Sequence, residues 1–241
     1  MTKPDIVYED ADLVLINKEA GILTIPDRFA PEKPNLLDLL NQMFDRIYTV
    51  HRLDKDTSGI LCFAKTEAAH SSLSQQFEQR IVKKYYLALV EGKMPQESAT
   101  IDAPIAKHLT IPGKMVVSNK GKHALTNYRL LEHFKHFSSV EAEILTGRTH
   151  QIRVHFAYIG HPLAVDPLYG KREAIFLSEI KQNRYRLGKD QEERPLMSRL
   201  TLHAQRLILQ HPRTKDEMAF EAKNPRDFGA LLKQLGKWGK K

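Results

Sequence analysis

Residues 47–64, IYTVHRLDKDTSGILCFA, place a polar loop between two apolar runs. Ile47–Val50 and Ile60–Ala64 are predicted to be short strands because they are rich in β-branched and aromatic residues. Between them, His51–Gly59 concentrates charged and hydroxyl side chains. Such crowding is typical of a functional site on a loop that a rigid scaffold holds in place. An aspartate here, or the Ser58-Gly59 pair, also fits an ordinary turn.

Further short strands are predicted on both sides of this loop. Apolar runs indicate two strands within residues 6–24 and others at Tyr85–Val90, Met115–Val117, Val140–Ile144 and Leu202–Gln210. Helices are predicted over Leu36–Phe44 with Asn35 as N-cap, over Glu67–Gln79 and over Thr149–Ile159. Many short strands with few helices between them predict an α+β fold with a mixed, mainly antiparallel β-sheet.

The chain shows neither a repeat nor a long linker, so we expect one domain over residues 1–241. Its core is expected from about residue 6 to residue 228, followed by a basic C-terminal tail over 229–241. Residues 171–195 mix seven Lys and Arg with five acidic residues and are bounded by turn signals. They are predicted to be a surface insertion, which is either an arm that contacts the substrate or a solvated loop or short helix.

Composition and charge narrow the classes of protein. A 41% hydrophobic content over 241 residues supports a buried core, and a single cysteine excludes a disulfide scaffold. No apolar run approaches the roughly 20 residues of a membrane span, and no signal segment opens the chain, so we expect a cytoplasmic protein. The formal charge is +8, divided as −4 over residues 1–50 and +12 over residues 51–241. This basic excess fits RNA, DNA or acidic lipid as a partner, or ordinary solubility.

Five ordered segments carry a family pattern. They are HRLDKDTSGIL at 51–61, KYYLALVEG at 84–92, LTGRTHQIRVH at 145–155, HPLAVDPLYG at 161–170 and LHAQRLILQHP at 202–212. Together they resemble the motifs of the RluA-type RNA pseudouridine synthases, in the order of that family and over nearly the whole chain. The resemblance implies a pseudouridine synthase fold with a central RNA-binding cleft, and an enzyme that isomerises uridines in RNA. Large-subunit ribosomal RNA is the favoured partner and transfer RNA the next.

The resemblance also assigns three catalytic residues. It implies that Asp54 is the catalytic carboxylate, that Tyr86 packs on the flipped base, and that Arg153 pairs with Asp54. A carboxylate charged at neutral pH can act as a nucleophile or a base. Pseudouridine formation changes no oxidation state, so neither a metal nor another cofactor is expected. The histidines at 150, 155 and 161 lack zinc-ligand spacing, in agreement with that expectation.

A second set of residues is expected to bind the substrate. Arg52 resembles the family arginine that enters the RNA stack where the target base leaves. His51, Leu53 and Thr57 are expected to shape the loop and bind RNA, and Arg148 and His150 to contact phosphate. Because the catalytic motif begins at residue 51, we expect the small N-terminal RNA-binding domain of many family members to be absent. Basic tracts such as Lys114–Lys122 would then hold the substrate on what we expect to be a monomer.

Two other functions remain open at this point. One is an RNA-binding or RNA-folding factor with a vestigial synthase site, against which stands the intact set Asp54, Tyr86 and Arg153. The other is a carboxylate-dependent RNA hydrolase, for which a second carboxylate or a metal cluster is missing from the motifs. The sequence leaves open which uridine is the target, and whether the aspartate attacks the sugar or the base.

Overall fold

The apolar run that follows the polar loop forms an interior strand of a sheet in the computed structural model of this chain. Strand β2 (Leu13–Lys18) pairs antiparallel with β4 (Ser58–Ala64), so that Leu13 lies opposite Ala64 and Lys18 opposite Gly59. All seven residues of β4 are buried, as expected for a central strand covered on both faces. The structure describes residues 3–186, 188 and 192–239.

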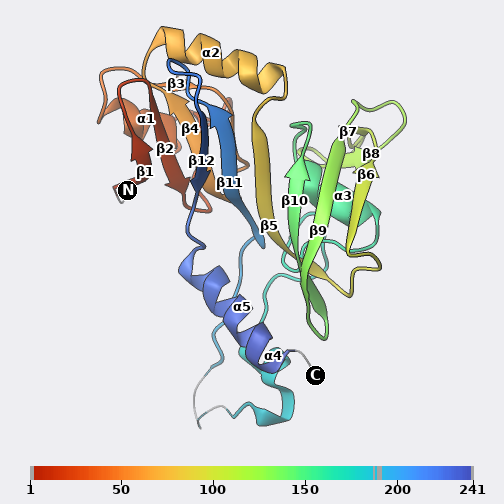
Figure 1. Ribbon diagram of the computed structural model, residues 1–241. Coiled ribbons are helices and arrows are strands. Elements are labelled where there is room, and N and C mark those ends of the chain that lie inside the picture. The colour runs from red at the N-terminus through yellow and green to blue at the C-terminus, as the bar shows by residue number, and fades with distance from the viewer. Residues whose placement is uncertain (1–2, 187, 189–191, 240–241) are drawn as a thin grey trace. The chain divides into compact units, whose positions relative to one another are not determined.

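The described chain divides into two compact units. The first consists of Met1–Tyr86 and His203–Lys223, and the second of Leu87–Leu202 and Asn224–Lys241. Figure 1 shows the elements of each unit. Strands β5 (Lys83–Glu91) and β11 (Leu202–Gln210) each contribute residues to both units, and the single domain over residues 1–241 stays a prediction.

The first unit is a sheet with one long helix packed on it. Its other elements are β1 (Asp5–Glu9), α1 (Leu36–Asn41), β3 (Tyr48–Thr49), α2 (Glu67–Glu78) and β12 (Glu217–Glu221). The strand order is β1-β2-β4-β11, and in addition β3 pairs with β4 and β12 with β11. Strand β11 runs parallel to β4. The pairs β1–β2, β2–β4, β3–β4 and β11–β12 are antiparallel. Ala69 and Leu73 of α2 share a core with Leu15, Cys62 and Leu207 of the strands.

The second unit combines an antiparallel sheet with short helices. Strands β6 (Ser98–Asp102), β9 (Leu125–His133) and β10 (Phe137–Ile144) follow the order β10-β9-β6, and β7 (Ile105–Lys107) forms a hairpin with β8 (Met115–Val117). The helices are α3 (Gln151–Tyr158), α4 (Leu177–Lys181), the 3-10 turn η1 (Gln182–Arg184) and α5 (Arg226–Trp238). The predicted α+β class with a mixed, mainly antiparallel sheet is confirmed.

Two expectations for the second unit were wrong. Residues 226–238 form α5 rather than the start of a basic tail, because Phe228, Leu231 and Leu235 line one face and are buried. The segment 171–195 is not wholly a surface insertion, since Ile175 and Ile180 are buried in the same core. Residues 187 and 189–191 of that segment lie outside the described residues.

Local signals explain where the predicted helices begin and end. The Asn35 side chain accepts a hydrogen bond from the backbone of Asp38, which confirms it as the N-cap of α1. The helix predicted to reach Phe44 ends at Asn41, after which the Met43 N–H donates to the carbonyl three residues back, that of Leu40, as in a tightened last turn. Among the described residues, none of the helices has the length and apolar character needed to cross a membrane.

Candidate active site

The loop that carries Asp54 runs between β3 and β4 in the first unit. Its tip is a turn in which the Thr57 N–H donates to the Asp54 carbonyl over 3.1 Å, so the turn geometry considered for this segment is present. Arg52 is exposed, Asp54 is partly buried, and Leu53 and Thr57 are buried. Arginine and aspartate therefore reach the surface from a loop whose neighbouring residues are anchored inside.

Residues 18–24 clamp the backbone on both sides of Asp54. The Thr24 hydroxyl donates to the Leu53 carbonyl over 3.0 Å and accepts from the Leu53 N–H over 3.3 Å. On the other side, the Lys55 carbonyl accepts from the Lys18 ammonium and from the Gly21 N–H, each over 2.9 Å. Both neighbours of Asp54 are thus held through main-chain atoms.

Lys18 is the least expected member of this clamp. The residue is 2% exposed, and its ammonium also donates to the carbonyls of Glu19 and Ile22. A buried lysine requires such saturation because its charge has left water. Sequence reasoning missed both Lys18 and Thr24; the one available signal was a lysine two residues after the apolar run Leu13–Ile16.

The far end of the loop is fixed to β11. His203 Nε2 lies 3.3 Å from the Ala222 carbonyl, which can only accept, so Nδ1 is the acceptor for the Ser58 hydroxyl at 3.0 Å. Gly59 follows with a φ of +120°, and a Cβ there would lie 2.1 Å from the Ala204 carbonyl oxygen. Only glycine permits this close parallel pairing of β4 with β11.

Tyr86 lies on β5 in the same unit as Asp54. Its side chain is buried, whereas the adjacent Tyr85 is partly buried and lies under the Arg206 guanidinium, 4.1 Å from the ring centroid. Burial, and then the negative charge of Asp54, raise the pKa of Tyr86 well above its usual value. The phenol therefore stays protonated and can donate a hydrogen bond next to the carboxylate.

His51 is built into the base of the loop. Its Nε2 accepts the Cys62 N–H over 3.0 Å, and its ring stacks on Phe77 with the centroids 4.6 Å apart. Burial, and then the charge of Lys84, lower the pKa of His51 to about 3. A neutral imidazole with one nitrogen already bonded to the backbone serves to anchor the loop.

Arg153 lies in the second unit and is held by Asp166. Its Nε and one terminal nitrogen each donate to a carboxylate oxygen over 2.8 Å, and the two side chains are 7% and 0% exposed. The guanidinium also lies 4.9 Å from the ring centroid of Tyr169. The expected pairing of Arg153 with Asp54 joins two different units and stays a prediction.

Helix α3 is buried on all sides over its first six residues. All six residues from Gln151 to Phe156 are buried, Arg153 among them. Gln151 fixes the preceding segment, because its side-chain oxygen accepts from the Thr146 hydroxyl and the Arg148 N–H. Polar side chains of this helix are therefore held inside the second unit.

The two residues expected to contact phosphate stand before α3. Arg148 is partly buried, and its Nε donates to the His123 carbonyl over 2.9 Å. His150 has a φ of 55°, and its Nδ1 lies 2.9 Å from the Tyr169 hydroxyl. That hydroxyl also accepts the Met115 N–H over 2.8 Å, so Tyr169 links residue 150 to the start of β8.

Comparison with known proteins identifies the family of this chain. A family model described as RNA pseudouridylate synthase matches residues 12–158. This chain belongs to the RNA pseudouridylate synthase family. It is 38% identical over 243 residues to the uncharacterized RNA pseudouridine synthase YlyB of Bacillus subtilis, covering 98% of this chain and 74% of that protein. The predicted family and the predicted enzyme class, an isomerase, are confirmed.

Other members of the family show similar sequences and structures. Ribosomal large subunit pseudouridine synthase D of Escherichia coli K12 is 36% identical over 243 residues, which cover 96% of this synthase and 70% of the relative. The solved structure of Human RNA Pseudouridylate Synthase Domain Containing 4 superposes with a TM-score of 0.72 at 25% identity, covering 96% of this chain and 93% of the human one.

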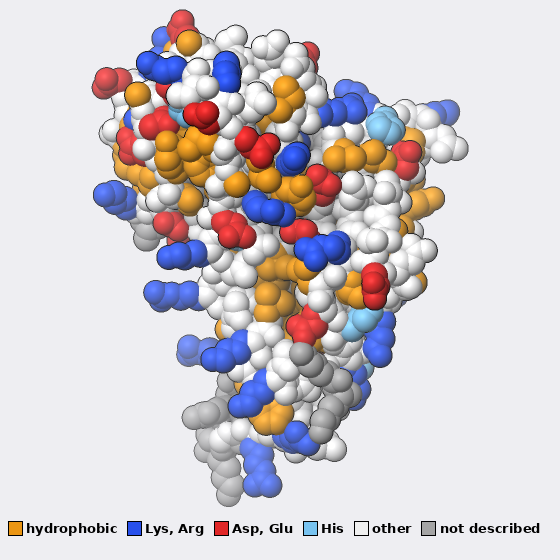
Figure 2. Space-filling model, in the orientation of Figure 1, with side chains coloured by type: hydrophobic (Ala, Val, Ile, Leu, Met, Phe, Trp, Pro, Cys, Tyr) orange, Lys and Arg blue, Asp and Glu red, His pale blue; other side chains and the backbone are white. Residues whose placement is uncertain are grey.

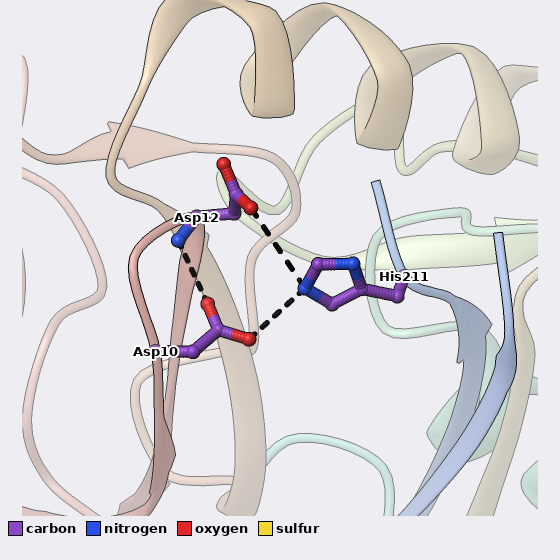
Figure 3. Close-up of side chains that lie close together, drawn as sticks. All are labelled: Asp10, Asp12 and His211. Atoms are coloured by element: carbon purple, nitrogen blue, oxygen red, sulfur yellow. Dashed lines mark hydrogen bonds and ion pairs between the residues drawn. The ribbon is translucent and has the colours of Figure 1, made fainter. Parts of the chain in front are cut away.

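A second polar cluster of the synthase lies between the β1–β2 and β11–β12 turns. Figure 3 shows Asp10, Asp12 and His211, whose oxygen and nitrogen atoms approach closely enough to suggest a metal site. His211 Nδ1 accepts backbone N–H groups of Arg213 and Thr214, so its Nε2 carries the proton that is donated to Asp10. Both oxygens of Asp12 accept from Arg213 at 2.7 Å. The atoms that could bind a metal are thus engaged in hydrogen bonds and ion pairs within the protein. We interpret the cluster as a link between the two turns.

Proposed function

We propose that this synthase isomerises uridine to pseudouridine in large-subunit ribosomal RNA, with Asp54 as the catalytic carboxylate. The observation that carries the proposal is the placement of Asp54 beside a protonated, buried Tyr86, on a loop whose backbone is clamped on both sides. The similarity to Ribosomal large subunit pseudouridine synthase D supports ribosomal RNA as the substrate. Transfer RNA is the next substrate class to test.

The proposed chemistry follows from these two side chains. The bond between uracil N1 and the sugar C1′ breaks, the base turns, and C1′ bonds to C5, while the proton of C5 is lost and N1 gains one. No electron is gained or lost, so the scheme needs no redox partner. Asp54 supplies a negative charge for attack or for proton abstraction, and Tyr86 donates a hydrogen bond to the sugar or the base. Arg153 is proposed to stabilise the Asp54 carboxylate.

RNA would be held by basic side chains around the catalytic loop and beyond it. Arg52 is exposed beside Asp54 and is proposed to fill the gap that the flipped base leaves. Arg148 and His150, and the basic tract Lys114–Lys122 that includes β8, are proposed to bind phosphate. His51, Leu53 and Thr57 contribute by shaping the loop. We further propose that the enzyme is a cytoplasmic monomer.

Replacement of Asp54 by asparagine tests the proposed role. Asp54→Asn should abolish pseudouridine formation in a ribosomal RNA transcript while binding of that RNA is kept. Asp56→Asn is the matched control, because Asp56 is exposed at the same turn and should retain activity. Undiminished isomerisation by Asp54→Asn would refute the assignment of the carboxylate. RNA annealing by the wild type without any isomerisation would instead favour an RNA-folding factor.

The substrate is tested by mapping pseudouridines chemically in total RNA from cells with and without the gene. A modification lost from large-subunit ribosomal RNA, and restored by wild-type protein but not by Asp54→Asn, would support the proposal. A modification lost only from transfer RNA would refute the ribosomal assignment while leaving the reaction intact.

A further inference from the structure

The only tryptophan of the chain lies in an unusually cationic setting in the second unit. Trp238 ends α5, and its ring centroid is 4.9 Å from the Lys237 ammonium, 5.7 Å from the Lys181 ammonium and 5.6 Å from the Arg184 guanidinium carbon. The three cations come from α4, η1 and α5, so segments far apart in the sequence converge on one ring. We call Trp238 and these three residues the tryptophan cluster.

The described acids carried by the helices of this cluster bind other residues. Within the part of the chain that the structure describes, no ion pair involves Lys181, Arg184 or Lys237. The two acids carried by these helices are engaged elsewhere: Glu179 of α4 pairs with Arg172, and Asp227 of α5 pairs with Arg199. Figure 2 shows Lys and Arg side chains gathered along α5 and around α4. Like charges held this close together favour an anionic partner.

A pocket adjoins the cluster. It is lined by residues of α4, η1, α5 and the β9–β10 turn. Phe137, Ile180 and Leu235 supply apolar walls, and Lys135, Arg172 and Glu179 are charged residues of the lining. The pocket therefore places apolar and charged side chains together next to the tryptophan cluster.

We propose that α4, η1 and α5 form an RNA-binding surface separate from the Asp54 loop. In this surface Trp238 stacks on an unpaired base, and Lys181, Arg184 and Lys237 bind the flanking phosphates. Stacking of a base on an aromatic ring next to basic side chains is how proteins hold single-stranded RNA without reading its sequence. The proposal rests on the proposed function, because it assigns an RNA segment outside the target uridine to this surface.

A lipid membrane fits the same surface less well. The apolar residues of α5, which are Phe228, Leu231 and Leu235, point into the protein core and are buried. A helix that binds a bilayer surface must present its apolar face to the lipid. Outside that buried face, α5 offers the exposed Lys237 and the partly buried Trp238, whose ring also packs on the core. A basic side chain next to an aromatic ring suits single-stranded RNA.

Intrinsic fluorescence gives a direct test, because Trp238 is the only tryptophan. The Asp54→Asn variant, which should bind RNA without turnover, is titrated with a ribosomal RNA fragment that contains single-stranded flanks. Base stacking should quench the Trp238 emission. The RNA concentration at half-maximal quenching should equal the dissociation constant measured by anisotropy of labelled RNA. Full RNA binding without any change in emission would overturn the proposal. Equal quenching by poly-glutamate or by phosphatidylserine vesicles would overturn it as well.

Charge removal supplies a second test. The triple variant Lys181→Gln, Arg184→Gln and Lys237→Gln should lower the log–log salt slope of binding by up to about 2, at roughly 0.7 for each lost phosphate contact. The matched control neutralises the exposed Lys3, Lys33 and Lys93. An equal loss of slope in the control would refute a specific surface.

Activity measurements separate this proposal from the proposed function. On a minimal stem-loop without flanking RNA, the triple variant should keep the wild-type kcat, whereas on the long fragment its KM should rise about tenfold. Wild-type protein that modifies no RNA at all contradicts the proposed function. Full activity on both substrates by the triple variant contradicts only the RNA-binding surface at the tryptophan cluster.

Discussion

Replacement of Thr24 by valine should disturb the Asp54 loop without touching the carboxylate. Valine has nearly the shape of threonine but lacks the hydroxyl that donates to the Leu53 carbonyl and accepts from the Leu53 N–H. Thr24 is 3% exposed and Leu53 is 7% exposed, so water cannot readily replace either hydrogen bond. The variant therefore leaves two buried main-chain groups without partners, next to the proposed catalytic residue.

The size of the effect follows from these two groups. An unsatisfied buried donor or acceptor costs about 1–3 kcal/mol. The bond at 3.3 Å is the weaker of the two, so we expect a loss of about 2–4 kcal/mol in the free energy of unfolding. If the loop shifts instead to reach water, the loss of stability is smaller, but Asp54 moves. A displacement of about 1 Å at a reacting group can lower the rate about 100-fold.

Urea unfolding and steady-state kinetics on an RNA substrate measure the two outcomes side by side. Thr24→Ser is the matched control, because it keeps the hydroxyl and should remain close to wild type in both assays. Thr24→Val should lower the urea concentration at the unfolding midpoint, the kcat, or both. A valine variant with wild-type stability and wild-type kcat would refute the role given to this clamp.

Three further substitutions test other contacts of the first unit. Gly59→Ala should destabilise the fold by roughly 3 kcal/mol or more in thermal or urea unfolding, because its Cβ would meet the Ala204 carbonyl at a positive φ. His51→Gln should reduce the loss of stability on acidification. The pKa of His51 is about 3 when folded and about 6.5 when unfolded, so its contribution is complete above pH 6.5 and falls by up to about 1.4 kcal/mol per pH unit towards pH 3. An unchanged pH profile of stability would contradict this. Arg213→Met should lower the stability at neutral pH, because Arg213 forms an ion pair with Asp12, and the difference from wild type should vanish in acid as Asp12 is protonated. A difference that stays constant down to low pH would exclude the ion pair as its cause.

Local patterns in the sequence were enough to predict much of the fold. Asn35 before an apolar repeat correctly predicted the start of α1, and the strands that flank the Asp54 loop lie where their apolar runs are. These features depend on residues a few positions apart. The predicted tail was wrong because its lysines, Lys233 and Lys237, alternate with apolar residues at helical spacing. Phe228, Leu231 and Leu235 form the buried face of α5.

The supports of the site could not be predicted in this way. Thr24 reaches Leu53 across 29 residues, and His203 reaches Ser58 across 145. Neither contact leaves a local pattern, because each is a single hydrogen bond made possible by strand pairing elsewhere. Motif resemblance predicted Asp54, Tyr86 and Arg153 as catalytic residues, but it gave no information on what holds them.

The two proposed catalytic charges are held in opposite ways, and this decides which variants are informative. The Asp54 loop is anchored through main-chain atoms of Leu53, Lys55 and Thr57, so a change of the Asp54 side chain leaves those anchors in place. Arg153 is anchored through its own guanidinium on the fully buried Asp166. Its removal would leave a buried carboxylate unpaired, at a cost of about 3–5 kcal/mol. Inactivity of an Arg153 variant therefore mixes lost chemistry with lost stability, whereas inactivity of Asp54→Asn reports on the chemistry.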